Sequence, residues 1–478
     1  MTDSLAPSDT LRVGLLSTIG SLDPRHAQDF ISALVLAQLY ESPYAPPTRD
    51  RPAQPRLFRG PLEGDLESRR FAATLRDDVE FWDETPLTAA ILADCLGRTP
   101  LRDQATIEAD GDRVVFRLAE PNARFDQVLT QTYASVTLER GGELVGTGPY
   151  LPAEITPQRV RLRRNERYRS PVGIGEIDLR VYPPDADGQP AALVAAFERG
   201  EVDFTNMLPR EAVSSLQRVR KYFERGNSTA LLYMNTQSPA LADARARRAV
   251  ALAIDRLEVA ARSHQNALAH VAANILPPLM SDWRDDLRPH PERARALLDE
   301  LGPDRPRRLK LKLIFGPRPY LPHPTRSAAV IAEQLANVGL EVEVHETKDS
   351  KEYYDTLTEK SFDLFLTGWI ADTADPTDFL EAILASSMIP RPGEPISVEA
   401  NLAHWRNERA DELLRRLRRS PTDRDRHALL RLAAEEMPVL PLMHGAFSFV
   451  HAWRVRNFDP PPLGIPDFST LELRDLFR

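Results

Sequence analysis

An arginine and an aspartate each lie a few residues after a short run that is predicted to be a strand, in the second half of the sequence. Arg318 follows the run 309–315, and Asp372 follows the run 362–366. A guanidinium group binds a carboxylate with two parallel hydrogen bonds, and a carboxylate accepts charge-assisted hydrogen bonds from an ammonium group. If both runs are strands of one sheet, the two groups lie on the same edge. Together they are complementary to a zwitterion with separated termini, which is the charge distribution of a short peptide.

An aromatic ring lies beside each of these charges, at Tyr320 and at Trp369. The alternative for Arg318 and Asp372 is that they are surface charges or pair with each other, because exposed ion pairs contribute little stability. Asp375 offers a second carboxylate, which would suit a catalytic pair with Asp372. A proline follows it, however, and an aspartate N-cap with proline at the first helical position is the structural interpretation.

The elements around these residues alternate between strand and helix. Strands are predicted at 309–315, 340–345 and 362–366, and helices at 326–338, at 351–358 and from Pro376. This βαβαβ order predicts a parallel sheet, in which ligands gather at the carboxyl ends of the strands. The start of the chain has the same order, with a strand at 11–16 and a helix of period 3.6 through Phe30, Leu34 and Leu39.

The common signatures of catalytic, nucleotide and metal sites do not occur in the sequence. The ten histidines are scattered without HxxxH or HExxH spacing, and there is no GxSxG, P-loop or GxGxxG motif. The single cysteine, Cys95, excludes an internal disulfide, and its apolar helical surroundings predict a buried thiol. We therefore expect no catalytic residue, no metal site and no cofactor, and the protein is not expected to be an enzyme.

The length and the net charge of the chain limit the number of domains and the classes of partner. The 478 residues exceed what one hydrophobic core holds, so two or three domains are expected. A net charge of −9 argues against nucleic acid as a partner, because such binding needs a clustered basic face. Residues 1–10 have neither the basic start nor the apolar core of a signal peptide, so export and a place inside the cell both remain open.

A series of short motifs runs along nearly the whole chain. They are LRVGLLSTIGSLDP at 11–24, FWDETPLTA at 81–89, GTGPY at 146–150, LRRNERY at 162–168, GEVDF at 200–204, MNTQSPALADARARRAVALAIDR at 234–256, GWIADTADPTDF at 368–379 and MPVLPL at 437–442. In order and spacing the series resembles the extracellular solute-binding proteins of the peptide/nickel class, which serve ABC importers. One departure is Glu84, which stands where that family usually has glycine.

The resemblance implies an α/β, two-lobed periplasmic-binding-protein (Venus-flytrap) fold with an extra inserted domain. Domain I would consist of residues 10–45, 146–236 and 440–478, the inserted domain II of residues 46–145, and domain III of residues 237–439. The glycines and proline of the GTGPY stretch and the Pro-rich stretch after Ser42 fall at these borders, where a crossover of the chain is expected.

For peptide binders of this family, the resemblance implies which residues hold the amino-terminal part of the ligand. The aspartate of the GWxxD stretch binds the α-ammonium group, and that position is Asp372 here. The backbone of Gly368, Trp369 and Ile370 would pair with the peptide like an added strand, giving affinity independent of the ligand's side chains.

The resemblance also assigns the carboxylate end of the ligand. In the dipeptide-type subgroup an RPYxP stretch supplies the arginine, which here is Arg318, followed by Tyr320. Phe30 and His444 would line the first-domain side of the cleft. A fixed distance between the two charged anchors would select the length of the ligand.

The implied function is binding without catalysis. A monomer would close over a short peptide and, if exported, deliver it to the permease subunits of an ABC transporter. The family implies a periplasmic or membrane-associated extracellular location, and a cytoplasmic one is the alternative. Three other functions remain open: a cytosolic ligand sensor with the same fold, a hydrolase using Asp372 and Asp375, and a binder of nickel complexes, haem, opines or oligosaccharides.

Overall fold

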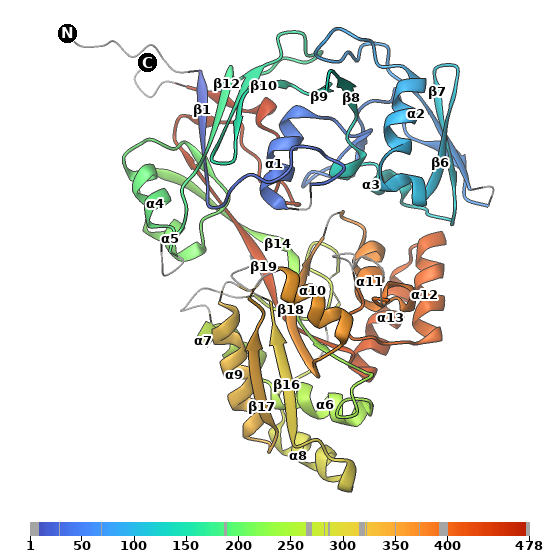
Figure 1. Cartoon of the computed structure of the whole chain (residues 1–478), viewed down its shortest axis with the longest axis vertical. Coiled ribbons are helices and arrows are strands. Elements are labelled where there is room, and N and C mark those ends of the chain that lie inside the picture. The colour runs from blue at the N-terminus through green and yellow to red at the C-terminus, as the bar shows by residue number, and fades with distance from the viewer. Residues whose placement is uncertain are drawn as a thin grey trace. The chain divides into compact units, whose positions relative to one another are not determined.

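Two compact units make up the chain. The computed structural model describes residues 9–474, except for residues 28, 68, 186–188, 264–269, 282, 285–286, 315–320, 322, 349, 372 and 392–399. Unit 1 consists of Met1–Glu224 and Phe447–Arg478, and unit 2 of Arg225–Ala446. Two long strands, β14 (Val219–Met234) and β19 (Val439–Ala452), continue from one unit into the other (Figure 1).

Unit 1 is built on a sheet with the strand order β10-β11-β12-β1-β13-β19. Its further strands are β1 (Thr10–Leu15), β10 (Tyr150–Thr156), β11 (Arg159–Arg164), β12 (Glu176–Val181) and β13 (Phe204–Thr205). β1 runs parallel to β12 and β13. Helix α1 (Phe30–Leu39) begins at the N-cap Asp29 and buries its apolar residues in the same core as β1. The predicted opening strand and helix are therefore confirmed.

A second core in unit 1 lies wholly between residues 44 and 145. It joins the sheet β4-β5-β7-β6 to helix α2 (Ala89–Gly97). The strands of this sheet are β4 (Glu63–Asp65), β5 (Arg70–Thr74), β6 (Ala105–Asp110) and β7 (Arg113–Leu118). An inserted domain needs a core of its own, and this one matches that requirement. The predicted borders of the three domains stay predictions.

The remaining helices and strands of unit 1 are short. They are β2 (Tyr44–Ala45), β3 (Gln54–Pro55), α3 (Phe125–Val128), β8 (Thr137–Arg140), β9 (Glu143–Gly146), α4 (Ala191–Glu198), α5 (Arg210–Ser215), β20 (Val455–Arg456) and β21 (Glu472–Leu473). Helices α4 and α5 share a small hydrophobic core. Gly200, with a φ of 70°, follows α4, because glycine adopts the left-handed conformation that ends helices without steric cost.

Unit 2 contains the predicted parallel arrangement. Its sheet has the order β19-β14-β18-β16-β17, with β15 (His270–Val271) on the other edge of β19. β16 (Arg308–Leu313) is parallel to both β17 (Glu341–Glu346) and β18 (Leu364–Ile370). The two apolar runs that precede Arg318 and Asp372 therefore share one sheet and point the same way, as predicted.

Helices cover both faces of this sheet, as a buried parallel sheet requires. One core packs the sheet against α6 (Ala244–Ala253), α7 (Arg256–Ser263), α8 (Pro291–Asp299) and α9 (Pro324–Ala336). The other packs it against α10 (Ser350–Glu359), α11 (Pro376–Leu384), α12 (Glu408–Arg419) and α13 (Asp423–Glu436) (Figure 1). Leu364 and Leu366 contribute to the first core and Phe365 to the second, which is the alternation of a strand.

Strand β18 is longer than the predicted run 362–366, since it continues to Ile370. The extension includes Gly368, a residue type that is poor in strands by itself. It is extended here because β14 pairs with β18 over its full length, and Trp369 lies opposite Thr229. Long-range pairing therefore determined this boundary, which local sequence could not show.

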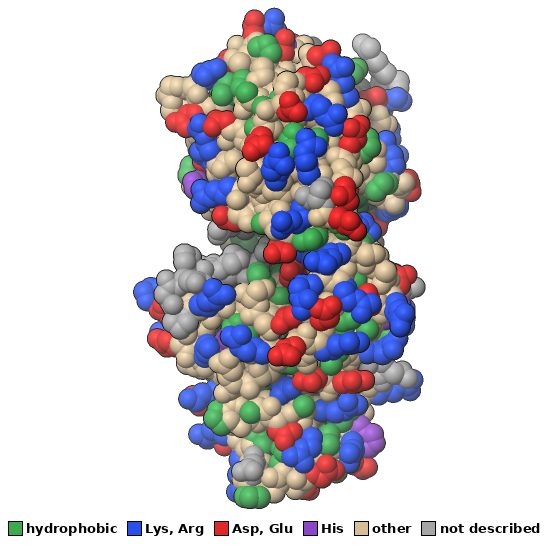
Figure 2. All heavy atoms as spheres, turned by 90° about the vertical axis from the view of Figure 1, so that its right-hand side faces the viewer, with side chains coloured by type: hydrophobic (Ala, Val, Ile, Leu, Met, Phe, Trp, Pro, Cys, Tyr) green, Lys and Arg blue, Asp and Glu red, His purple; other side chains and the backbone are tan. Residues whose placement is uncertain are grey.

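The surface carries charges of both signs. On the face drawn in Figure 2, Lys and Arg side chains are interspersed with Asp and Glu rather than separated from them. Many are paired, as in the contacts of Arg262 with Glu258 and Glu333. Among the described helices, none combines the length and the hydrophobicity of a membrane span.

Glu84, at the position where the resembled motif has glycine, has a φ of 68°. A non-glycine residue in this region costs about 1–2 kcal/mol. We expect Glu84→Gly to be more stable than Glu84→Ala by about 1 kcal/mol, because both variants remove the ion pair with Arg167 and only glycine relieves the backbone. Urea denaturation of both variants measures the difference, and equal stabilities would contradict the strain.

Candidate functional site

The end of β18 pairs with β14 along one edge only. Gly368, Trp369 and Ile370 lie opposite Ala230, Thr229 and Ser228. The N–H of Ala371 donates to the Asn227 carbonyl at 2.8 Å. In an antiparallel pair, alternate residues direct their backbone groups to the partner strand. The odd-numbered residues 367–371 therefore direct theirs toward β14, and Gly368 and Ile370 direct theirs to the opposite edge.

That opposite edge belongs to β16 further back along the strand. The Leu366 carbonyl accepts a hydrogen bond from the N–H of Ile314 at 3.0 Å, and β16 ends at Leu313. Beyond this point, no strand in the described part of the chain pairs with Gly368 or Ile370. Their N–H and C=O groups thus form an edge on which an extended ligand backbone can pair.

Side chains of the site lie on both faces of the sheet. Trp369 packs against the core that contains α11 and α12, and Ile370 against the opposite core. Thr229 lies opposite Trp369, and its Oγ1 is 3.0 Å from His444 Nδ1. Trp369, Thr229 and His444 are therefore close together. His444 lies in unit 2, while Phe30 lies in unit 1 and stacks on Phe447 at 6.1 Å.

Asp375 has the contacts of a helix cap, as the structural interpretation predicted. Its carboxylate accepts the N–H of Thr377 at 2.9 Å at the start of α11. Burial, together with the charge of Asp378, raises the pKa of Asp375 to about 6. Arg418 pairs with Asp378 at 2.9 Å and with Glu381, so this charged group is assembled from α11 and α12.

The three predicted anchors, Arg318, Tyr320 and Asp372, lie outside the described residues. The structure describes the strands that lead to them and the residues that flank Asp372. Sequence reasoning missed two residues of the site, Asn227 and Thr229. Both belong to the polar stretch GNST at 226–229, which resembles a loop and gives no strand signal.

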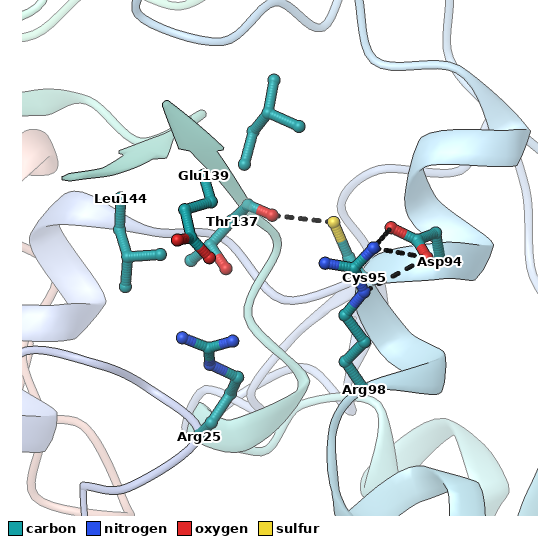
Figure 3. Close-up of a pocket in the computed structure, with 8 residues that line it drawn as sticks. Arg25, Asp94, Cys95, Arg98, Thr137, Glu139 and Leu144 are labelled. Carbon is teal, nitrogen blue, oxygen red and sulfur yellow. Dashed lines mark hydrogen bonds and ion pairs between the residues drawn. The ribbon is translucent and has the colours of Figure 1, made fainter. Parts of the chain in front are cut away.

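A small pocket in unit 1 surrounds the only cysteine. It is lined by Arg25, Asp94, Cys95, Arg98, Thr137, Leu138, Glu139 and Leu144. Figure 3 shows the Cys95 thiol directed at the Thr137 carbonyl, to which it donates at 2.7 Å. Burial raises the pKa of Cys95 to about 11, so the thiol is unreactive at neutral pH. The predicted buried thiol is confirmed.

Both arginines of this pocket already have carboxylate partners. Arg25 makes a bidentate contact with Asp23, and Arg98 pairs with Asp94 at 2.7 Å (Figure 3). Among the described residues, no group of three or more His, Cys, Asp or Glu could hold a metal ion. Since both of its arginines are already paired with carboxylates, the pocket offers no free guanidinium group for an anionic ligand.

Comparison with known proteins identifies the family. "Bacterial extracellular solute-binding proteins, family 5 Middle" matches residues 63–389. Di/tripeptide-binding protein 2 of Pseudomonas aeruginosa is 28% identical over 375 residues, which cover 74% of this chain and 68% of the relative. A probable ABC transporter periplasmic-binding protein, SapA of Escherichia coli, is 28% identical over 389 residues, covering 75% and 68%.

The fold agrees with this match. The structure of HbpA2 from Haemophilus parasuis has a TM-score of 0.83 at 20% identity, covering 97% of this chain and 100% of that one. The predicted α/β periplasmic-binding-protein fold is thereby confirmed. With a family match over more than half of its residues, the chain belongs to the bacterial extracellular solute-binding proteins, family 5.

Proposed function

We propose that the protein binds short peptides and delivers them to the permease of an ABC importer, outside the cytoplasm and as a monomer. The observation that carries the proposal is the backbone edge of Gly368 and Ile370, which no described strand occupies. Pairing through the ligand's main chain accepts many side chains, and this suits a peptide importer. The names of the two relatives, a di/tripeptide-binding protein and an ABC-transporter binding protein, support the same class of ligand.

Charged anchors would fix the two ends of the peptide. Asp372 follows Ala371 directly after β18 and would bind the α-ammonium group. Arg318 would bind the carboxylate, with Tyr320 and Trp369 beside the peptide. Each bond between a charged group and its partner contributes about 1.5–3 kcal/mol. Phe30 and His444 would add contacts from α1 and β19.

Isothermal titration calorimetry with free dipeptides to tetrapeptides tests this function. The wild type is expected to bind, and Asp372→Ala is expected to weaken binding about 10- to 100-fold, because the ammonium group loses its partner. Asp94→Ala, which removes an exposed acid in unit 1, is the control that should bind normally. No binding to any peptide, or full binding by Asp372→Ala, would refute the proposal. Mass spectrometry of the incubated peptides should find them uncleaved, since the proposed role is binding alone.

A further inference from the structure

Strands β14 and β19 are neighbours in the sheet, and in unit 1 they bring an arginine and a tryptophan together. Arg220 lies near the start of β14, and Trp453 directly follows the last residue of β19. The guanidinium carbon of Arg220 lies over the Trp453 ring, 5.0 Å from its centroid. Two residues further along each strand, Tyr222 and His451 stack with their ring centroids 5.6 Å apart. Both contacts fit one antiparallel register, so the four side chains share one face of the sheet.

The guanidinium group of Arg220 has no carboxylate partner in the described part of the chain. Its Nε is buried and has no hydrogen-bond acceptor. Arg199, in the same unit, shows the more common arrangement, because its Nε lies 2.7 Å from the carboxylate of Glu201. A partly buried cation without a counter-charge reduces stability. The positive charge of Arg220 is therefore uncompensated among the residues around it.

The acids on the neighbouring strands already pair with other arginines. Asp203 directly precedes β13, which pairs with β19, and its carboxylate contacts Arg12 at 2.8 Å and Arg454 at 3.4 Å. Glu224, also on β14, pairs with Arg49 at 2.8 Å. Neither acid is left to neutralise Arg220, so its counter-charge has to come from outside these strands.

His451 gives independent evidence of this excess positive charge. It is 1% exposed, and its Nδ1 lies 2.9 Å from the carbonyl oxygen of Ala452. That contact assigns the proton to Nδ1, and the buried Nε2 has no hydrogen-bond partner. Burial lowers the pKa of His451, and the charges of Arg220 and Arg456 lower it further, although the bond to Ala452 opposes them. The electrostatic potential at this site is therefore positive and attracts an anion.

Trp453 keeps the site open to a partner. Its side chain is 44% exposed, which is a large exposed fraction for an aromatic residue. Stacking covers one face of the Arg220 guanidinium, but the N–H groups of a guanidinium point outward in its plane. A carboxylate can therefore bind edge-on with two hydrogen bonds while the stacking persists. Tryptophan and arginine are also the residue types that most often dominate the energetics of protein interfaces.

We propose that Arg220 and Trp453 form a docking site on unit 1 for a partner protein that presents a carboxylate side chain next to an apolar one. The carboxylate binds the free edge of the guanidinium, and the apolar group covers the exposed part of the indole. Gly368 and Ile370, the proposed ligand edge, belong to unit 2, so docking and peptide binding use different residues. The permease of an importer would be such a partner, and only that identification rests on the proposed function.

NMR of the tryptophan indole N–H groups tests the site in the full chain. The chain has five tryptophans, and the Trp453 signal is assigned by its loss in Trp453→Phe. The probes are N-acetylglutamyl-leucine amide and its glutaminyl counterpart, whose blocked ends carry no terminal charge. The acidic probe should shift the Trp453 signal with an affinity about tenfold above that of the neutral one, the size of one charge-assisted contact.

Arg220→Gln should remove this preference for the acidic probe. Arg220→Lys should restore only part of it, because an ammonium group lacks the planar fork that binds a carboxylate with two bonds. Arg199→Gln is the matched control, since it removes a guanidinium group from unit 1 that already has a carboxylate partner. This control should bind both probes as the wild type does.

Three results would overturn the docking site. The first is a Trp453 signal that neither probe shifts, or that both shift with equal affinity. The second is an equal loss in Arg220→Gln and Arg199→Gln, because binding would then follow the total charge of the protein. The third is an equal response to sodium acetate, which would indicate a site for small anions rather than for a protein. None of these results bears on peptide binding, which calorimetry with free peptides measures separately.

Discussion

Replacing Glu41 by alanine is expected to lower the free energy of unfolding by about 3–5 kcal/mol, the loss typical of a broken buried ion pair. Glu41 is 1% exposed and accepts two hydrogen bonds from Arg169, at 2.8 and 2.6 Å. It also accepts the hydroxyl groups of Tyr168 at 2.8 Å and Thr147 at 3.0 Å. Burial alone would lower the pKa of Arg169, but the hydrogen bond and charge of Glu41 outweigh it and raise that pKa. Alanine would leave a buried guanidinium without its counter-charge.

Urea denaturation of a mutant cycle measures this effect. The double variant Glu41→Leu with Arg169→Met should be more stable than Glu41→Leu alone, because it removes the unpaired charge as well. Asp94→Ala is the control, since it breaks the exposed pair with Arg98 and should cost less than about 1 kcal/mol. Strictly additive losses in the cycle would contradict the coupling, and a loss as small as that of Asp94→Ala would contradict the importance of burial.

This network explains two of the sequence motifs. Thr147 belongs to GTGPY and Tyr168 to LRRNERY, and both bind the carboxylate that directly follows α1. The motifs identified the family, yet Glu41 itself carried no signal. Its partners lie 106 to 128 residues further along the chain. Periodicity and motif spacing describe neighbours in sequence, so an ion pair of this range becomes visible only in the fold.

The α/β order could be predicted because its signals are local. Apolar runs and helical period indicated the strands and helices from residue 309 to the helix that begins at Pro376 before any pairing was known. Strand β14 was not predicted, because residues 219–229 are largely polar. It is extended because it lies between β18 and β19 in the sheet, and that arrangement joins residues more than 100 positions apart.

The sequence indicated which residues form the candidate site, but not which edge of the sheet their backbone groups face. The position of Gly368, Trp369 and Ile370 followed from a motif. Which edge their backbone groups face depends on the register with β14, and a shift by one residue would reverse it. The contact between Thr229 and His444 depends on the same register. The roles of Arg318, Tyr320 and Asp372 stay predictions, because these residues lie outside the described part of the chain.

Replacing Asp375 by asparagine is expected to stabilise the protein at pH 7 and to have almost no effect at pH 4. Burial and the charge of Asp378 raise the pKa of Asp375 from 3.8 to about 6 in the folded state. Between these values the folded protein binds more protons than the unfolded chain, so stability falls as pH rises through this window. The fall amounts to about 2–3 kcal/mol, since each pKa unit corresponds to about 1.4 kcal/mol. Asparagine keeps an acceptor for the Thr377 N–H and carries no charge to bury.

The observable is the difference in unfolding free energy between Asp375→Asn and the wild type, measured by denaturation from pH 4 to pH 7. Charged groups that respond equally to pH in both proteins cancel in this difference. It should grow with pH and level off above about pH 6, by the sign of the raised pKa. Asp375→Ala separates the loss of the helix cap from the loss of the charge. Its unfolding free energy should show the same pH dependence as that of Asp375→Asn but should be about 1 kcal/mol lower at every pH, because alanine cannot cap the helix. If the difference instead grew toward acid pH, Arg418 would stabilise the ionised Asp375 carboxylate by more than burial destabilises it. That result would contradict the raised pKa of Asp375.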